Sequence, residues 1–417
     1  MDIKTYRLFQ ISELEVCVIV PLLIFPSLIW ILLNLGQGIL SFVSIIYIIF
    51  YLYFLTNYRF RKIAFSWPLC IWLILTAYHL VNASLKEVPE INYVDYLRGF
   101  KCYASICIFT LFFSQKANIT FKVIFYSLLV WQLIVLCFAE YSPGERLSIN
   151  GIVSVTIGKN AAIMATAGIF WSIMERKNIK TVVYKVIFPV IIILLAQTRN
   201  AFGFVLIMLM GYYYSEVMKC KLTIKHLILS LICVIFAFFS LSVMIENTGL
   251  GDRFSDDFKK VNENTYKTTY QTGTIFDYVV GERIIYYYTG WEIFMKHPWT
   301  GIGLDNYQNY MQGAYPMHVE YMTHLAEGGI IAATLWMLFI ISLFVVISRA
   351  KISKQKKSMA YFTMGAIIFT CFFSVMYEQE LQMMLYAIIL SINYPSRGNF
   401  FNTKSTLFSA LKKKYEH

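Results

Sequence analysis

Long apolar stretches separated by short polar segments run along almost the whole chain. Each stretch holds about 20 residues, which is enough for a helix to cross a hydrocarbon core of roughly 30 Å. The pattern predicts about twelve membrane-spanning helices, with one large polar loop between the ninth and the tenth. The predicted spans cover residues 13–35, 38–57, 63–83, 95–114, 121–140, 154–174, 182–198, 201–218, 222–245, 329–349, 358–377 and 381–395.

The composition indicates a fold that has lipid as its solvent. Hydrophobic residues make up 58% of the chain and charged residues 14%, whereas soluble domains carry about 25% charged residues. A soluble fold of 417 residues could not bury this much apolar surface. We therefore expect an all-α integral membrane protein.

The distribution of charge predicts the orientation. A net charge of +12 would suggest nucleic-acid binding in a soluble protein. Here most of the 36 basic residues lie in alternate polar segments, which would share one side of the membrane. Because basic loops favour the cytoplasm, we expect both termini to be cytoplasmic. Since the orientation accounts for the positive charge, we expect no nucleic-acid partner. These segments contain Lys4, Arg7, Arg59, Arg61, Lys62, Lys116, Lys122, Arg176, Lys177, Lys180, Lys185, Lys219, Lys221, Lys225, Arg349, Lys351, Lys354, Lys356 and Lys357.

The predicted spans, the large loop and the tail divide the chain into four parts. Residues 1–245 are predicted to form the first nine transmembrane helices, and residues 329–395 the last three. Residues 246–328 begin polar and become amphipathic, so we expect this loop to fold against the outer membrane face. Residues 396–417 form a basic cytoplasmic tail.

Several cations fall near the predicted outer membrane interface. Arg199 lies in a short turn between two apolar runs, where an ionisable group is costly unless it is paired. An anionic headgroup or phosphate would pair with it; the alternative is a snorkelling anchor or a structural salt bridge. Arg98 and Lys101 raise the same question, with Asp95 close enough in sequence to neutralise one of them. Lys159 is a further cation expected to be buried on this side.

The end of the large loop carries a second group of candidates. Arg283 opens its amphipathic part, and Gly301 and Gly303 permit a tight turn or a close backbone approach. His318 and Glu320 come just before the tenth span. A histidine at this place can take up or release a proton near neutral pH; the alternative is an interfacial histidine that only forms hydrogen bonds.

No metal site or disulfide framework is expected. His318 and His324 have a poor spacing for one helical face, and the HExxH motif is absent. The eight cysteines lie within or at the ends of apolar stretches, without a CxxC pair.

Together these residues resemble a known family. Their order and spacing are similar to the C-terminal region of the O-antigen ligase and O-antigen polymerase superfamily of bacterial envelope proteins. The turn Thr198–Phe202 is similar to that family's short arginine motif, whereas Val319 stands where the family often has asparagine. The residues that carry the resemblance are Arg283, Trp291, Pro298, Gly301, Ile302, Gly303, Asn306, Tyr307, His318, Glu320, Tyr321, Ala326, Glu327, Gly328 and Gly329.

The resemblance implies an activity. It implies a GT-C-like fold in the bacterial inner membrane and an inverting, metal-independent glycosyl transfer at the periplasmic face, without a cofactor. The donor would be an undecaprenyl-pyrophosphate-linked oligosaccharide. Arg199 and Arg283, with Arg98 as a weaker third, would bind the pyrophosphate. His318 would orient or deprotonate the attacking sugar hydroxyl.

The remaining candidates complete the predicted site and its partners. Lys159, Glu320, Gly301, Gly303 and Tyr321 are predicted to bind substrate. The acceptor would be a lipid-linked repeat unit, for a polymerase, or lipid A core, for a ligase. Membrane lipid and a regulator of chain length are further expected partners.

Two alternatives stay open at this point. The sequence has a high content of Tyr and Phe and a low content of Gly and Ala, which suggests a low-GC polysaccharide locus. Such a locus favours the polymerase over the ligase. A transporter would also fit about twelve spans, but it predicts ionisable residues near the middle of the bilayer. Central acidic residues are missing from the predicted spans, and the candidate cations lie at one face.

Overall fold

The structure is a computed structural model that describes residues 10–33, 38–86, 93–139, 147, 154–196, 198–217, 284–311, 317, 319–374 and 381–394. Helices make up its regular structure, and the described residues contain no strand. The predicted span 222–245, most of the large loop and the predicted tail lie outside the described residues.

The first helices follow the predicted spans closely. They are α1 (Glu13–Leu33), α2 (Gly38–Leu55), α3 (Tyr58–Ala64), α4 (Trp67–Leu85) and α5 (Tyr93–Phe138). Helix α5 covers the predicted span 95–114 and the predicted span 121–140 as far as Phe138, and it is bent at Lys116, where φ is −137° and ψ is 42°. Across the bend, the rings of Phe113 and Phe121 stack with their centroids 4.6 Å apart.

The remaining helices include the largest departure from the predicted bounds. They are α6 (Ser154–Met174), α7 (Ile179–Leu195), α8 (Arg199–Tyr212), a π-helix (Tyr213–Val217), α12 (Ile284–Lys296), α13 (Tyr307–Tyr310), α14 (Glu320–Arg349), α15 (Lys354–Phe373), α16 (Met383–Leu390) and a 3-10 helix (Ser391–Asn393). Helix α14 begins at Glu320, ahead of the predicted start at residue 329. At Gly329 its backbone is non-helical, with φ of 66° and ψ of −166°.

Three helical segments in the described part of the chain are long and apolar enough to cross a membrane. They are Trp67–Leu85, Gly99–Phe138 and Glu320–Arg349. Two shorter apolar helices, Val43–Leu55 and Met383–Asn393, accompany them. The structure is therefore consistent with a membrane protein, and the number of about twelve spans stays a prediction.

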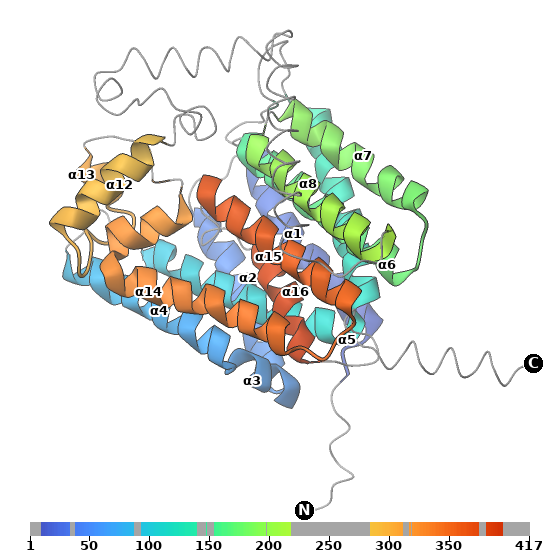
Figure 1. The fold of residues 1–417 in the computed structure, drawn as a ribbon, viewed down its shortest axis with the longest axis horizontal. Helices are drawn as coiled ribbons and strands as arrows, with labels where there is room; N and C mark the ends of the chain where they lie inside the picture. The colour runs from blue at the N-terminus through green and yellow to red at the C-terminus, as the bar shows by residue number, and fades with distance from the viewer. Residues whose placement is uncertain are drawn as a thin grey trace, which may run out of the picture.

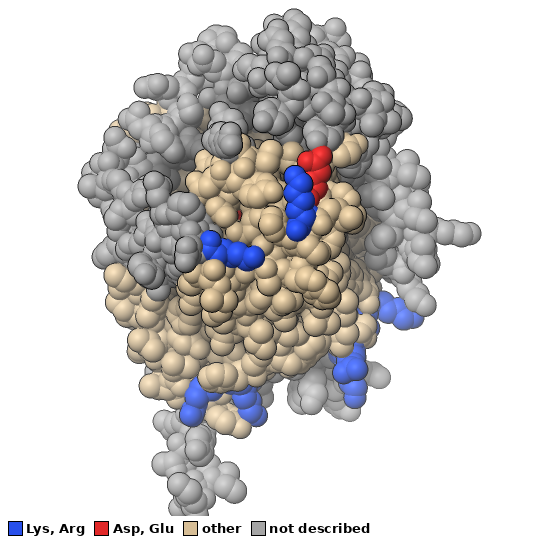
Figure 2. Space-filling model, turned by 90° about the vertical axis from the view of Figure 1, so that its left-hand side faces the viewer, with Lys and Arg blue, Asp and Glu red and all other residues tan. Residues whose placement is uncertain are grey.

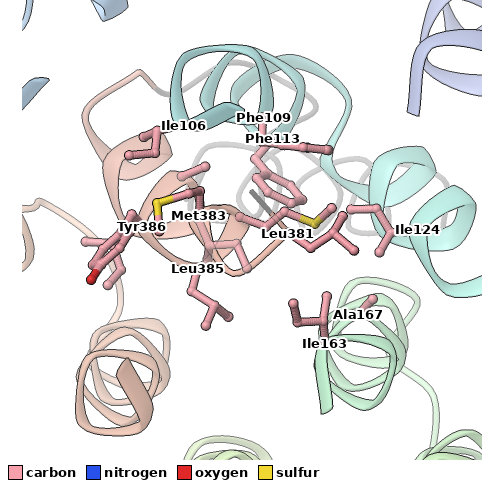
Figure 3. Packing of buried hydrophobic residues seen from close by; sticks show 14 of the residues in the cluster. Ile106, Phe109, Phe113, Ile124, Ile163, Ala167, Leu381, Met383, Leu385 and Tyr386 are labelled. Carbon is pink, nitrogen blue, oxygen red and sulfur yellow. The ribbon is translucent and has the colours of Figure 1, made fainter. Parts of the chain in front are cut away.

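Helix α16 lies in the centre of the fold. It contacts α5, α14 and α15 (Figure 1), and every residue from Met383 to Leu390 is buried. Figure 3 shows Leu385 and Tyr386 of α16 among side chains from α5, such as Phe109, and from α6, such as Ile163. A helix that is apolar on all sides lies either in a protein core or in lipid, and the burial of its residues places α16 in the core.

The outer surface of the helices is apolar. Helix α7 exposes Val183, Ile187, Ile191 and Leu194, which recur near helical spacing and suit contact with lipid. The side of the molecule in Figure 2 is largely uncharged where the structure describes it, with basic side chains mainly along its lower edge.

Segments predicted to be cytoplasmic meet at one end of the helices. Nζ of Lys116 lies 3.5 Å from Oε1 of Glu13, and the Tyr394 hydroxyl donates a hydrogen bond of 3.1 Å to the carbonyl of Lys62. We call this the inner end. The opposite end, which carries Ala196, Thr198 and the turn at 298–303, is called the outer end.

Candidate active site at the outer end of the helices

The turn that carries Arg199 is short and tightly packed. Helix α7 ends at Leu195, and the N–H of Thr198 donates to the carbonyl of Ile193 at 3.2 Å. Arg199 is the first residue of α8. Gly158 of α6 packs against this turn, because a Cβ there would lie 2.3 Å from Oγ1 of Thr198. The glycine therefore lets α6 approach the start of α8.

A small cavity lies beside this turn. Helix α8 packs against α6 and α15, and the cavity between these helices and α16 has a volume of about 20 Å³. Its polar residues are Lys159, Asn200, Thr370 and Gln382, and its other lining residues are Ala162, Ile163, Ala201, Phe204 and Leu385. The predicted substrate-binding residue Lys159 is 5% exposed. The structure thus places Lys159 and the residue after Arg199 on one cavity.

Glu320 is not among the residues that line this cavity. It is the first residue of α14 and is fully buried.

A buried pair of histidines joins α4 to α14. Nε2 of His79 and Nδ1 of His324 are 2.9 Å apart and share a hydrogen bond. On its other side, Nε2 of His324 lies 3.4 Å from Oε1 of Glu320, one helical turn earlier. All three side chains are 1% exposed or less. This array can hold and pass a proton within the protein, because imidazole groups both donate and accept hydrogen bonds.

The predicted glycines form a turn that packs on the backbone of α14. Gly301 and Gly303 have φ of 64° and 98°, and a Cβ on Gly301 would lie 2.5 Å from the carbonyl oxygen of Ala326. The N–H of Gly303 donates to the carbonyl of Glu327 at 2.9 Å. The prediction of a tight turn and a close backbone approach is therefore confirmed, and the contacts of both glycines are with the chain itself.

Glu327 and Asn82 hold this turn in place. The Glu327 carboxylate accepts hydrogen bonds of 3.1 Å from the backbone N–H groups of Asp305 and Tyr307. Nδ2 of Asn82 donates to the carbonyls of Thr300, at 2.7 Å, and of Glu327, at 3.2 Å. The end of α4 therefore fixes the turn at 298–303 onto the start of α14.

Two tyrosines anchor the outer helices. Tyr321 packs its ring against Tyr287 of α12 and Phe372 of α15, at centroid distances of 5.6 and 5.2 Å. The Tyr307 hydroxyl lies 2.6 Å from Oγ1 of Thr289. Burial raises the pKa of the Tyr307 phenol, which therefore stays protonated at neutral pH.

The predicted site residues fall into two groups. Lys159, Gly301, Gly303, Glu320 and Tyr321 lie at the outer end of the helices, as described above. The side chains of the other four lie outside the described residues. Arg199 begins α8 and Arg98 lies within α5, but only their backbones are described. Arg283 and His318 lie outside the described residues entirely. Their predicted roles stay predictions.

Sequence reasoning missed several polar residues of this region. His79 interrupts an apolar span, and an ionisable residue inside a span is a signal of function or pairing that could have found it. Asn200 and Gln382 lie at the starts of helices, where polar residues are common as caps, so the sequence alone did not single them out. Lys101 is buried in α5, and its role stays open.

The described residues contain no group of three or more His, Cys, Asp or Glu side chains that could hold a metal ion.

Comparison with known proteins gives one match. Residues 185–337 match the family model described as O-antigen ligase, and no curated protein matches the chain. The matched segment begins in α7 and ends in α14, so it contains the Arg199 turn, the turn at 298–303 and the buried residues Glu320 and His324. The match of residues 185–337 supports the predicted resemblance to the O-antigen ligase and O-antigen polymerase superfamily.

Proposed function

We propose that the protein is a surface-polysaccharide polymerase that transfers an undecaprenyl-pyrophosphate-linked glycan to a sugar hydroxyl on a second lipid-linked repeat unit. The observation that carries the proposal is the match of residues 185–337 to the O-antigen ligase family model. This segment includes Arg199, Arg283 and His318, the three residues predicted to do the chemistry.

The surroundings of Arg199 support the binding of a diphosphate. Arg199 begins α8, and the N-terminus of a helix offers backbone N–H groups and a positive dipole to an anion. Lys159 lies on the cavity next to the same helix end. Arginine binds phosphate oxygens through two parallel hydrogen bonds, and a cation beside it adds to the attraction.

The transfer then needs charge stabilisation and a proton acceptor. In the proposed step, the acceptor oxygen bonds to the anomeric carbon while the bond from that carbon to the diphosphate oxygen breaks, with inversion. Arg199 and Arg283 stabilise the negative charge that the diphosphate gains. His318 takes the proton of the attacking hydroxyl. No step in this scheme needs a metal ion.

We propose that Glu320 assists His318 during the transfer. Glu320 follows His318 in the sequence with one residue between them, and its carboxylate is fully buried near His324. A carboxylate in this place favours the protonated form of a neighbouring imidazole. We propose that this stabilises the imidazolium that forms during the transfer.

The ligase is the second candidate, because the family model that matches is described as O-antigen ligase. A deletion strain separates the two. Loss of a polymerase leaves single repeat units on the lipid A core, whereas loss of a ligase leaves core without any repeat unit. A surface-glycan ladder of normal length in the deletion strain would contradict both.

An assay with the reconstituted protein distinguishes an enzyme from a transporter. The purified protein in lipid vesicles is given a radiolabelled undecaprenyl-pyrophosphate-linked saccharide, and the products are separated by size. New glycosidic bonds are expected. Movement of the label across the bilayer without new bonds would favour a transporter, which the family match does not favour.

A further inference from the structure

Two buried polar atoms on the small cavity between α6, α8, α15 and α16 have no hydrogen-bond partner among the described residues. They are Nδ2 of Asn200 and Oε1 of Gln382, and their residues are only 5% and 4% exposed. Both residues line the cavity. Because buried polar groups are almost always hydrogen-bonded, a water molecule or a ligand group in this cavity must supply the missing partners.

The orientation of the Asn200 amide is fixed by a contact of its own. Oδ1 of Asn200 accepts a hydrogen bond of 2.8 Å from the N–H of Ala201. The amino group of Asn200 is therefore the part left to donate. Lys159 adds a positive charge to the same cavity.

The opposite wall offers acceptors. Oε1 of Gln382 is a carbonyl oxygen and can only accept a hydrogen bond. The Thr370 hydroxyl already donates to the carbonyl of Ala366 at 2.8 Å, so its oxygen is left as an acceptor. The cavity therefore combines donors on the α6 and α8 side with acceptors on the α15 and α16 side.

This combination selects among ligand groups. A phosphate oxygen only accepts hydrogen bonds, so it would satisfy Asn200 and Lys159 and leave Oε1 of Gln382 without a donor. A hydroxyl group accepts and donates at once, so it satisfies both walls. The apolar side chains of Ile163, Phe204 and Leu385 complete the lining, as is usual for binding sites with a few placed polar groups.

The size of the cavity limits the ligand group further. Its volume is about 20 Å³, and one water molecule needs roughly 10–15 Å³ of such space. A group of the size of one hydroxyl therefore fits. Because Asn200 follows Arg199 directly in the sequence, such a hydroxyl would lie close to a diphosphate bound by Arg199.

We propose that this cavity, the hydroxyl pocket formed by Lys159, Asn200, Thr370 and Gln382, binds one hydroxyl of the sugar next to the diphosphate of the lipid-linked saccharide. The pocket thereby selects which saccharides are transferred. This inference rests on the proposed glycosyl transfer and adds a structural basis for the enzyme's specificity toward its saccharide substrate.

The test uses the full-length protein in lipid vesicles and a set of substrate analogues. The probes are the undecaprenyl-pyrophosphate-linked repeat unit, versions that each lack one hydroxyl of the first sugar, and undecaprenyl pyrophosphate without sugar as a competitor. The variants are Asn200→Ala and Gln382→Met. Gln308→Met, the same substitution at an exposed glutamine of α13, is the control.

The wild type is expected to transfer one deoxy analogue about tenfold less efficiently than the complete substrate, which is the size of effect of one hydrogen bond. Asn200→Ala and Gln382→Met should lower kcat/KM for the complete substrate by a similar factor. They should leave kcat/KM for that deoxy analogue unchanged. The preference then disappears in these variants and persists in Gln308→Met.

Other outcomes overturn the inference in distinguishable ways. Equal transfer of all analogues by the wild type, or a preference that survives in both variants, means that the cavity holds only a structural water. Weaker competition by undecaprenyl pyrophosphate without sugar in both variants means that the cavity binds phosphate. Unchanged competition also shows that a variant is folded. A wild-type protein that forms no glycosidic bond overturns the proposed function itself.

Discussion

Single residues at the outer end of the helices carry the proposed chemistry, and they can be tested one at a time. We predict that His318→Ala and Arg199→Ala each abolish transfer and leave the amount of protein in the membrane unchanged. The reason is that one change removes the proton acceptor and the other removes a cation that holds the leaving group. Transfer by the purified variants in vesicles is the measurement.

Two further variants sharpen that test. Arg199→Lys should stay strongly impaired, because an ammonium group cannot form the paired hydrogen bonds of a guanidinium. Lys177→Ala, at an exposed position of the connection between α6 and α7, should transfer normally. If His318→Ala or Arg199→Ala retained activity, that residue would have no place in the mechanism.

The buried histidine pair predicts a loss of stability. His79→Leu removes the partner of Nδ1 of His324, which is 2.9 Å away and fully buried. Leaving such a group unsatisfied costs about 1–3 kcal/mol. The unfolding temperature in detergent should therefore fall for His79→Leu, less for His79→Gln, and little for Ser84→Ala on the exposed side of α4. An unchanged unfolding temperature for His79→Leu would show that the hydrogen bond contributes nothing.

At this scale the sequence revealed cations more readily than neutral polar groups. Lys159 could be recognised because a charge near an apolar span is expensive wherever the chain folds. Asn200 and Gln382 could not, because a carboxamide at a helix end is ordinary until its burial and its missing partner are known. The predicted roles of His318, Arg283, Arg199 and Arg98 stay predictions.

Helices and their connections decide how these residues meet, and Gly329 is the clearest example. Its φ of 66° and ψ of −166° lie in a region that is essentially open to glycine alone, and a Cβ there would lie 2.3 Å from the carbonyl oxygen of Trp299. We predict that Gly329→Ala destabilises the protein by more than the roughly 1–3 kcal/mol that this backbone conformation alone costs. Thermal unfolding measures this change.

Helix α15 supplies a matched control for that variant. A Cβ on Gly365 would meet no atom closer than 4.0 Å, and the residue lies in regular helix. Gly365→Ala should therefore leave the unfolding temperature unchanged or raise it slightly, since alanine favours helix. Equal losses in both variants would mean that α14 is not held at Gly329.

Helix bounds were predictable where hydropathy changes sharply. Predicted span 154–174 coincides with α6, and span 13–35 differs from α1 only at its end. The start of α14 was not predictable, because Glu320, His324 and Glu327 read as a polar loop. In the structure their side chains are buried: His324 shares a hydrogen bond with His79 of α4, Glu320 lies 3.4 Å from His324, and Glu327 accepts a hydrogen bond from the N–H of Asp305. Hydropathy cannot register such tertiary partners.

The whole molecule has an expected orientation that a labelling experiment tests. In a variant without native cysteines, Lys177→Cys should react with a membrane-impermeant thiol reagent only after the cells are opened. Tyr310→Cys should react in intact cells, because the outer end is predicted to be periplasmic. Both positions are exposed. Positive charge on the predicted cytoplasmic segments is the physical reason. The reverse labelling pattern would place the proposed site on the wrong side for its substrate.

The central place of α16 has a consequence for biosynthesis. Its residues are buried against α5, α14 and α15, which precede it in the chain. The earlier helices can enter the lipid as they are synthesised, but the space that α16 occupies stays open until it arrives. The final assembly step is thus a late insertion by one of the last helices, and a ribosome that stalls before residue 383 leaves a chain that is in the membrane yet has no closed interior.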